Sequence, residues 1–485
     1  MVSSITHVDV LVIGAGLSGI AAGYHLQAES PLSSYLILES RAVIGGTWDL
    51  FRYPGIRSDS DMYTLGYSFR PWSGARAIAD GPSILEYIRE TAKAFGIDEK
   101  IRFHHRADKA SWSSDEARWT VEVTQIETGE AAQFKCRFLL GCTGYYDYEG
   151  GYTPAFPGVE RFAGRVVHPQ KWTDDVEYAG KRVVVIGSGA TAVTLVPELA
   201  KKAAHVTMLQ RSPSYVVSLP GEDKVAHWLR TKVSKKTAYG LVRWKNVGIG
   251  MATYSFCRRF PERAKKLMVG GVRKTLGVEF DVEKHFTPTY APWDQRVCLV
   301  PDGDLFASIR SGKASVKTDT IDTFTETGIR LKSGEEVPAD VVVTATGLKL
   351  LLAGRMNLVV DGANVEPSKT LNYKGAMLSD VPNFAIVLGY TNASWTLKAD
   401  LVCEYVCRLL EIMRKQGYRR CTPRVSGMRG DEQPLMNFSS GYVIRALSDL
   451  PKQGAKHPWR LYQNYLLDLF GLRHGAVADG ILEFA

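Results

Sequence analysis

The chain has 485 residues, of which 45% are hydrophobic and 23% charged, and its formal net charge is +9 at pH 7. This composition is that of an ordinary globular enzyme, and the length allows two or three domains with substantial cores. No run of 18 apolar residues occurs, which argues against a membrane-spanning helix. The seven cysteines show neither CxxC nor His/Cys metal spacing, so we expect reduced thiols, no metal site and a cytoplasmic location.

A glycine-rich turn follows the first predicted strand. The apolar run at residues 8–13 predicts a buried strand, and the sequence GAGLSG at residues 14–19 then leads into a helix-like segment. Gly14 permits a tight turn, Gly16 lets the backbone approach a pyrophosphate, and Gly19 allows close packing of helix and strand. The N-terminus of the following helix favours an anion. We therefore predict a dinucleotide site here.

The next strand identifies the nucleotide. Residues 35–38 predict a strand that ends at Glu39, 20 residues after Gly19. A carboxylate at this place accepts hydrogen bonds from both ribose hydroxyls, which suits an adenosine without a 2′-phosphate, such as that of FAD. A glycine-rich turn in some other α/β protein is the alternative, and the agreement of strand, helix and acid argues against it.

A second fingerprint, GSGATA at residues 187–192, begins 173 residues after the first. It follows an apolar strand at residues 182–186, and the next predicted strand ends in Gln210-Arg211-Ser212 without a carboxylate. An arginine and a hydroxyl can hold a 2′-phosphate, so this site favours NADPH over NADH. Ala192 at the third glycine position gives weak additional support. The alternative is that Arg211 only faces solvent at the end of the strand and contacts no phosphate.

Two such fingerprints predict an α/β fold with two Rossmann-like dinucleotide-binding domains, one for FAD and one for NADPH. Residues 340–344 predict a strand that is followed by Ala-Thr-Gly at residues 345–347. The predicted strand at residues 138–141 is followed by the similar Cys142-Thr143-Gly144, so we expect the chain to return to its first domain after residue 347. The predicted boundaries are 1–150 for the first part of the FAD domain, 151–346 for the nested NADPH domain and 347–485 for the second part of the FAD domain. The cleft between the domains is the expected site of hydride transfer.

A basic helical insertion is predicted at about residues 222–290, inside the NADPH domain. From Lys224 to Lys274 fourteen Lys or Arg residues stand against one acid, Glu262, with tryptophans and aliphatic residues between them at helical spacing. Three explanations of this charge remain open. The basic residues could simply face solvent, bind a membrane surface, or create an electrostatic field that attracts the polyanion NADPH. Because no nucleic-acid-binding module accompanies the charge, we expect no nucleic-acid partner.

Two longer motifs carry a family resemblance. Residues 162–172 match FxGxxxHxxxW, and the run from Gly45 to Asp59 matches the pattern [A/G]GxWxxxx[F/Y]P[G/M]xxxD. The chain therefore resembles the type I Baeyer–Villiger monooxygenases, a group of flavin monooxygenases. The resemblance covers essentially the whole chain and is greatest to mycobacterial members of the family. Thr173 departs from the family pattern, which usually has Pro or Asp there.

The resemblance implies FAD and NADPH as cofactors, with O2 and a ketone or thioether as substrates. Through a C4a-peroxyflavin, one oxygen atom would convert ketones to esters or lactones and thioethers to sulfoxides. It also implies that Arg296 is catalytic, since a fixed guanidinium stabilises a peroxy anion and an oxyanion, and that Asp59 orients Arg296. Gln295 replaces the family's usual lysine.

The remaining site residues follow from the fingerprints and from the resemblance. We expect His168 of the FxGxxxHxxxW motif to be a structural hinge contact, and Asn392 and Trp395 to line the substrate pocket. The residues expected to contact FAD, or the junction of flavin and nicotinamide, are Gly14, Gly16, Ser18, Gly19, Glu39, Gly46, Thr47, Trp48, Asp49, Leu50, Arg57, Ser58, Asp59 and Ala107, the last at the end of a strand at residues 102–106. The residues expected to contact NADPH are Gly187, Ser188, Gly189, Ala190, Thr191, Ala192, Val193, Arg211 and Ser212.

Two other functions remain open. A flavin N/S-monooxygenase would oxidise only soft heteroatoms, and Trp172 and Arg296 argue against it. A non-oxygenating flavoprotein could use the basic insertion for peripheral membrane contact, and it would consume NADPH without an oxygenated product.

Overall fold

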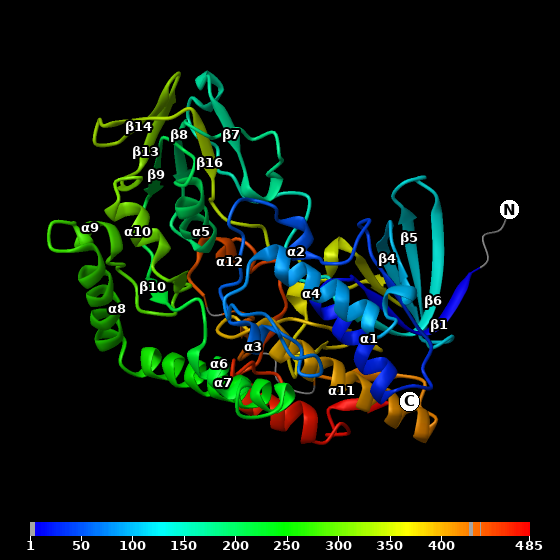
Figure 1. Ribbon diagram of the computed structural model, residues 1–485. Helices are drawn as coiled ribbons and strands as arrows, with labels where there is room; N and C mark the ends of the chain where they lie inside the picture. The colour runs from blue at the N-terminus through cyan, green and yellow to red at the C-terminus, as the bar shows by residue number, and fades with distance from the viewer. Residues whose placement is uncertain (1–4, 426–429, 437) are drawn as a thin grey trace.

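Two separate sheets organise the chain (Figure 1), and the computed structural model describes residues 5–425, 430–436 and 438–485. In the first sheet β1 lies parallel between β2 and β6, while β4, β5 and β6 are antiparallel. Its strands are β1 (Thr6–Ile13), β2 (Tyr35–Leu38), β3 (Ile101–Arg102), β4 (His105–Ser113), β5 (Arg118–Gln125), β6 (Ala131–Gly141), β17 (Asn357–Val360), β18 (Ala363–Asn364), β19 (Asn372–Tyr373), β20 (Met377–Leu378) and β21 (Phe384–Ile386).

The apolar run in β1 is explained by cores on both faces of this sheet. Val10 and Val12 pack in the core beneath the helices, whereas Leu11 and Ile13 face a second core that contains Trp112. Successive side chains of a strand point to opposite faces, so a strand covered on both sides is apolar at every position.

Helices α1 and α11 pack against each other on one face of the first sheet. Helix α11 was predicted at residues 400–415 but begins five residues earlier, directly after Ser394, a residue type favoured before helices. The helices of this domain are α1 (Leu17–Glu29), α2 (Thr47–Leu50), α3 (Met62–Leu65), α4 (Gly81–Ala94), α11 (Trp395–Gln416), α12 (Gly441–Ile444) and α13 (Tyr465–Asp468), which a π-helical turn (Leu469–His474) continues.

The second sheet is parallel throughout, in the order β12-β9-β8-β16-β7. Helices α5 (Ala190–Leu199) and α10 (Asp304–Arg310) pack against it. Its strands are β7 (Arg165–Val167), β8 (Arg182–Ile186), β9 (His205–Gln210), β12 (Ala314–Thr318) and β16 (Val341–Thr344). Smaller sheets contain β10 (Val216–Leu219), β11 (Cys298–Pro301), β13 (Ile321–Thr325), β14 (Gly328–Leu331), β15 (Glu336–Pro338), β22 (Cys421–Pro423), β23 (Gln433–Pro434), β24 (Lys452–Gln453) and β25 (Leu482–Phe484).

The second domain is nested in the first, as predicted. The strands of the first sheet come from residues 6–141 and 357–386, whereas those of the second come from residues 165–344. We retain 1–150, 151–346 and 347–485 as proposed domain boundaries.

The insertion is helical, with α6 (Lys224–Arg230), α7 (Lys235–Arg259), α8 (Pro261–Leu276) and α9 (Val282–Phe286). One of its basic residues is not solvated: Arg243 is buried and donates to the carbonyl oxygens of Tyr63 and Gly66 at 2.8 and 2.7 Å. This arginine attaches α7 to the segment around α3. No helix in the described part of the chain is long and apolar enough to cross a bilayer.

Candidate active site

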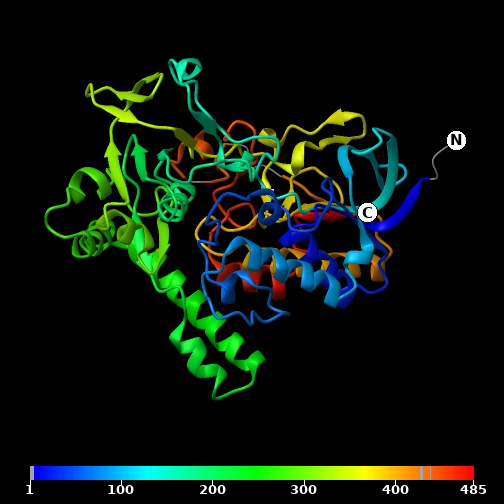
Figure 2. The same cartoon turned by 45° about the horizontal axis from the view of Figure 1, so that its top comes forward.

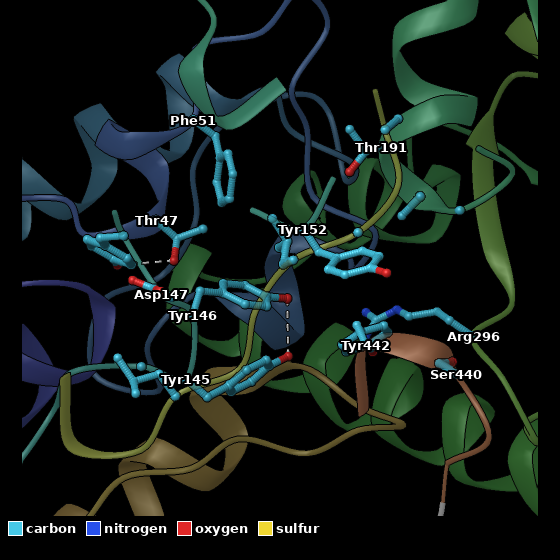
Figure 3. A pocket seen from close by; sticks show the side chains of 18 of the residues that line it. Thr47, Phe51, Tyr145, Tyr146, Asp147, Tyr152, Thr191, Arg296, Ser440 and Tyr442 are labelled. Atoms are coloured by element: carbon cyan, nitrogen blue, oxygen red, sulfur yellow. Dashed lines mark hydrogen bonds between the residues drawn. The ribbon is translucent and has the colours of Figure 1, made fainter. Parts of the chain in front are cut away.

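A cavity of about 1000 Å³ lies between the two domains, and both glycine-rich turns line it. Ligand pockets span roughly 300–1,000 Å³, so this cavity is at the upper limit of that range and suits a large ligand. Figure 3 shows a ring of aromatic side chains around it, with Arg296 on one wall.

The first turn has the close backbone packing that a pyrophosphate site requires. Gly14 has φ 105°, and a Cβ there would lie 2.6 Å from the carbonyl oxygen of Cys142. A Cβ at Gly19 would overlap the carbonyl oxygen of Gly14. Gly16 and Gly46 lie next to each other in the wall of the cavity, and a side chain at either position would narrow the cavity there. The backbone of this turn therefore leaves room for the pyrophosphate of a dinucleotide.

Glu39 lies at the end of β2, as predicted, and lines the cavity. Its buried carboxylate accepts from the backbone N–H groups of Ala15 and Arg41 at 2.8 and 2.9 Å. Burial raises the pKa of this carboxyl group, and the two backbone hydrogen bonds oppose that rise. The carboxylate is thus held in place beside the first turn, where a ribose would lie.

The second turn has similar backbone geometry but different polar groups. Gly187 has φ 138°, and a Cβ there would overlap the carbonyl oxygen of Ala345. The Ser188 hydroxyl donates to the carbonyl oxygen of Ser212 at 3.0 Å, which joins the turn to the end of β9. Arg211 is exposed and lines the cavity beside Ser212. Its guanidinium forms no ion pair with any of the described residues, and a guanidinium at this place fits a phosphate-bearing ribose.

Arg296 and Asp59 form an ion pair inside the cavity. The Arg296 side chain is 33% exposed, so it is accessible to a ligand. The Asp59 carboxylate raises the pKa of the guanidinium above its ordinary range, which keeps Arg296 charged. Trp293, in the loop that leads to Arg296, has φ 70°, a conformation that costs free energy for a bulky residue.

Tyrosines surround this ion pair (Figure 3). The hydroxyls of Tyr145 and Tyr146 lie 3.3 Å apart. Burial raises the pKa of Tyr146, and it raises the pKa of Tyr442 to about 12, so both phenols stay protonated and can donate hydrogen bonds. Arg445 lies over the ring of Tyr152, with its guanidinium carbon 3.6 Å from the ring centroid. The aromatic rings therefore make most of this cavity wall apolar, and the phenol hydroxyls and guanidinium groups supply its few polar atoms.

Several predicted site residues come together at the cavity, whereas others do not reach it. Ser18 accepts a 2.7 Å hydrogen bond from the indole of Trp395, and both line the cavity. Asn392 does not line it, because its side-chain amide donates to the carbonyl oxygen of Gln463. The further predicted residues that line the cavity are Gly46, Thr47, Trp48, Arg57, Ser58, Ala107, Gly189, Ala190 and Thr191.

Five predicted site residues lie differently from the expectation. Asp49 is buried in ion pairs with Arg41, Arg52 and Arg89 rather than facing the cavity, and neighbouring Leu50 does not line it either. Ala192 and Val193 are buried in the hydrophobic core under α5. Ala107 does line the cavity, but it lies within β4, at a register shift, rather than at the end of a strand. These differences arise because the helical turns and the bulge orient side chains that sequence spacing cannot place.

His168 contacts both connections between the domains. Its Nε2 donates to the carbonyl oxygen of Gly347 at 3.3 Å, while Nδ1 accepts from the backbone N–H of Gln170. A Cβ at Gly151 would overlap the imidazole ring. Burial lowers the pKa of His168, which favours the neutral ring. This placement supports the predicted hinge contact.

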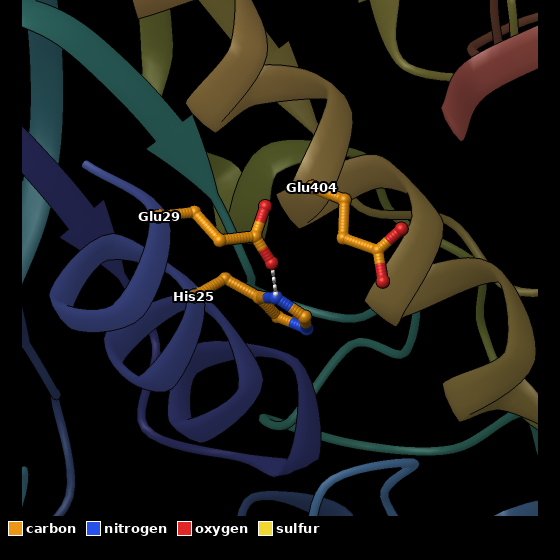
Figure 4. A group of neighbouring side chains, drawn as sticks. All are labelled: His25, Glu29 and Glu404. Atoms are coloured by element: carbon orange, nitrogen blue, oxygen red, sulfur yellow. Dashed lines mark hydrogen bonds and ion pairs between the residues drawn. The ribbon is translucent and has the colours of Figure 1, made fainter. Parts of the chain in front are cut away.

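A second titratable cluster lies away from the cavity, between α1 and α11 (Figure 4). His25 Nδ1 and Glu29 are 2.7 Å apart, and its Nε2 lies 3.5 Å from Asp400. Glu404 lies nearby but pairs with Arg473. Burial alone would lower the pKa of His25, but hydrogen bonds to Asp400 and Glu29 raise it to about 9. The guanidinium of Arg243 also lies 3.6 Å from Asp400. With Arg243 and Arg473 included, three cations face three carboxylates, so we assign this cluster a structural role.

Comparisons with known proteins agree with this geometry. A family described as Flavin-binding monooxygenase-like matches residues 78–235, and an NAD(P)-binding Rossmann-like domain matches residues 12–78. The protein named FAD-containing monooxygenase EthA from Mycobacterium tuberculosis is 54% identical over 480 residues, which are 99% of this chain and 98% of the relative. Its namesake from Mycolicibacterium smegmatis is 53% identical over 479 residues, covering 99% of this chain and 97% of the relative. The chain belongs to the FAD-containing monooxygenase family.

Solved structures of other monooxygenases share this fold. An oxidized steroid monooxygenase bound to NADP has a TM-score of 0.72 at 24% identity, over 86% of this chain and 88% of that one. An open structure of cyclohexanone monooxygenase has a TM-score of 0.73 at 20% identity, and the match covers 86% of this chain and 90% of that one. The predicted family, fold and cofactor types are thereby confirmed.

Most of the aromatic wall was not predicted from the sequence. Tyr145, Tyr146 and Tyr148 directly follow β6, and the carboxyl ends of parallel strands are where such folds bind ligands. That position was the available signal. No comparable signal marked Tyr442 or Arg445, because they reach the cavity from the distant C-terminal segment.

Proposed function

We propose that this protein uses NADPH and O2 to insert one oxygen atom into ketones, giving esters or lactones, and to oxidise thioethers to sulfoxides. The observation that carries the proposal is the Arg296–Asp59 ion pair in a cavity lined by both dinucleotide fingerprints. A fixed cation at this junction is what oxygen transfer to a carbonyl requires, because negative charge develops on the carbonyl oxygen.

The chain's own residues would hold both cofactors. The first turn with Glu39 would hold the adenosine half of FAD, and the second turn with Arg211 would hold NADPH. Ser58 and Arg57 line the cavity beside Asp59, and Arg57 pairs with Asp304 of the second domain. When bound, FAD would take electrons from NADPH and activate O2, the source of the oxygen atom.

Arg296 would act on the substrate and Asp59 would orient it. The guanidinium presents several N–H donors in a rigid plane, so it can bind a developing oxyanion while it remains paired with the carboxylate. The protonated hydroxyls of Tyr146 and Tyr442 could donate to the same substrate. The apolar bodies of these rings would exclude water from the reacting carbonyl.

The test replaces Arg296. Arg296→Ala should retain FAD but lose at least 100-fold in ester formation, about 3 kcal/mol, because one oxyanion partner is gone. NADPH oxidation should then yield hydrogen peroxide instead of ester. Asp59→Ala should show milder uncoupling, and Arg296→Lys should recover little because the planar fork is lost.

Product analysis decides between the candidate functions. Ester formation by Arg296→Ala at near wild-type rate and coupling would place the active site elsewhere. Sulfoxide without any ester from the wild-type protein would instead identify an N/S-monooxygenase. NADPH consumption without either product would identify a non-oxygenating flavoprotein.

A further inference from the structure

Helix α7 exposes three large apolar side chains to solvent. The side chains of Leu241, Trp244 and Ile249 are 51%, 49% and 58% exposed. At 3.6 residues per turn Leu241 and Trp244 lie about 60° apart on one side of the helix, roughly opposite the buried Val242 and Val247. Ile249 lies farther along the helix, within about 20° of the direction of Val242. A surface helix ordinarily presents polar residues to water. Helix α7 therefore has large apolar side chains that the protein does not cover, in addition to its buried ones.

This apolar surface extends beyond α7. Val225 and Trp228, one turn apart on α6, are exposed, and α6 packs against α7. Away from α6, the rings of Trp244 and Tyr465 lie 5.9 Å apart. Helix α13 and the turn that follows it expose further large apolar side chains, among them Leu467 and Phe470. We call this set the hairpin surface, and its members are Val225, Trp228, Leu241, Trp244, Ile249, Leu467 and Phe470.

The hairpin surface lies on a projecting part of the molecule. Figure 2 shows the green helices of residues 224–259 extending away from the body of the protein. At the connection between α6 and α7, Lys232, Lys235 and Lys236 are all exposed. Fourteen Lys or Arg residues stand against one acid between residues 224 and 274. A projecting apolar face with basic flanks can reach a flat surface without interference from the rest of the chain.

We propose that the hairpin surface docks this protein on an anionic lipid bilayer, with Leu241, Trp244 and Ile249 entering the headgroup region. Tryptophan favours the membrane–water interface, and helices with an apolar face and basic flanks lie in that interface. Each lysine near the surface adds attraction to anionic lipids. A second copy of the chain fits less well, because two copies would bring the same basic surface together and repel. Docking is independent of the chemistry proposed above.

The experiment is vesicle flotation of the FAD-loaded, full-length protein. Vesicles of phosphatidylcholine are compared with vesicles that also contain phosphatidylglycerol. We expect at least tenfold stronger binding to the anionic vesicles and a marked loss of binding at high salt, since salt screens the lysines. Equal binding to both kinds of vesicle, or none to either, would overturn the proposal.

Two double variants test the two components separately. Leu241→Ser with Trp244→Ser removes apolar contacts, and Lys235→Glu with Lys236→Glu reverses charge; each should weaken binding at least tenfold. The matched controls are Leu32→Ser, an exposed leucine after α1, and Lys201→Glu with Lys202→Glu after α5, and these should bind within twofold of wild type. Unchanged flavin content and melting temperature establish that each variant is folded.

Self-association is measured on the same variants by sedimentation velocity. A wild-type dimer that dissociates in Leu241→Ser/Trp244→Ser, without vesicle binding by the wild type, would assign the hairpin surface to contacts between copies and overturn membrane docking. Product formation, measured in parallel without vesicles, reports on the proposed oxygen transfer and not on docking.

Discussion

The turns at Gly14 and Gly187 have nearly the same backbone geometry, yet the strands that follow them end differently. Both glycines have positive φ and approach a carbonyl oxygen of the neighbouring strand connection, at Cys142 and Ala345. After the first turn β2 ends in the buried carboxylate of Glu39, whereas β9 is followed by the exposed guanidinium of Arg211.

This comparison separates two tasks of a dinucleotide site. The turn provides space and N–H groups for a pyrophosphate, and any such turn does so in the same way. The end of the second strand selects the nucleotide, because a carboxylate suits free ribose hydroxyls and an arginine suits a phosphate. Substitutions in the turn should therefore abolish binding, whereas substitutions at the strand end should change selectivity.

The largest expected effect is at the third turn position. A Cβ at Gly19 would overlap the carbonyl oxygen of Gly14, whereas the second turn has Ala192 at the corresponding place. Gly19→Ala should reduce bound FAD at least 100-fold, measured by flavin absorbance of the purified protein. Ala192→Gly is the matched control and should leave the NADPH KM within threefold. Full flavin content in Gly19→Ala would show that the two turns tolerate the same residues.

The helices after the two turns also differ. Helix α1 carries the buried, charged His25, whereas the corresponding helix α5 is buried through apolar side chains such as Val193 and Leu195. Since the pKa of His25 is raised to about 9, its contribution to stability is complete below pH 6.5 and is lost as the pH rises through 9. That contribution is at most about 3 kcal/mol.

We therefore expect the melting temperature of the wild type to fall between pH 6.5 and 9, and His25→Gln to remove most of this slope. His205→Gln, on β9 of the second domain, is the control and should keep the wild-type slope. Parallel pH profiles for wild type and His25→Gln would show that the cluster in Figure 4 does not hold a charged histidine.

The smallest expected effect is at Arg211. Arg211→Gln should raise the KM for NADPH at least tenfold, about 1.4 kcal/mol, and leave the KM for NADH within twofold. Comparing both cofactors in one variant isolates the contact with the 2′-phosphate. An equal loss for NADPH and NADH would mean that Arg211 affects the turn rather than the phosphate, and equal use of both by the wild type would refute the assignment.

The local parts of the site could be predicted because they depend on short stretches of chain. Gly14, Glu39 and Gly187 follow strands whose apolar residues identify them, so their place at the carboxyl edge of a sheet follows from periodicity alone. The resemblance supplied Arg296 and Asp59, which are far apart in the sequence and meet only through the packing of two domains. Ala107 and Asp49 were misplaced because a strand bulge and arginine partners decide where they lie.

By itself, then, the sequence determined the two nucleotide turns, the nested order of the domains and the helical nature of the insertion. Each depends on residue types at fixed short spacings, which backbone sterics convert directly into structure. Only the tertiary structure decided which tyrosines line the cavity and which face of α7 remains uncovered. Both depend on what packs against a residue from elsewhere in the chain, and residue spacing carries no information about that partner.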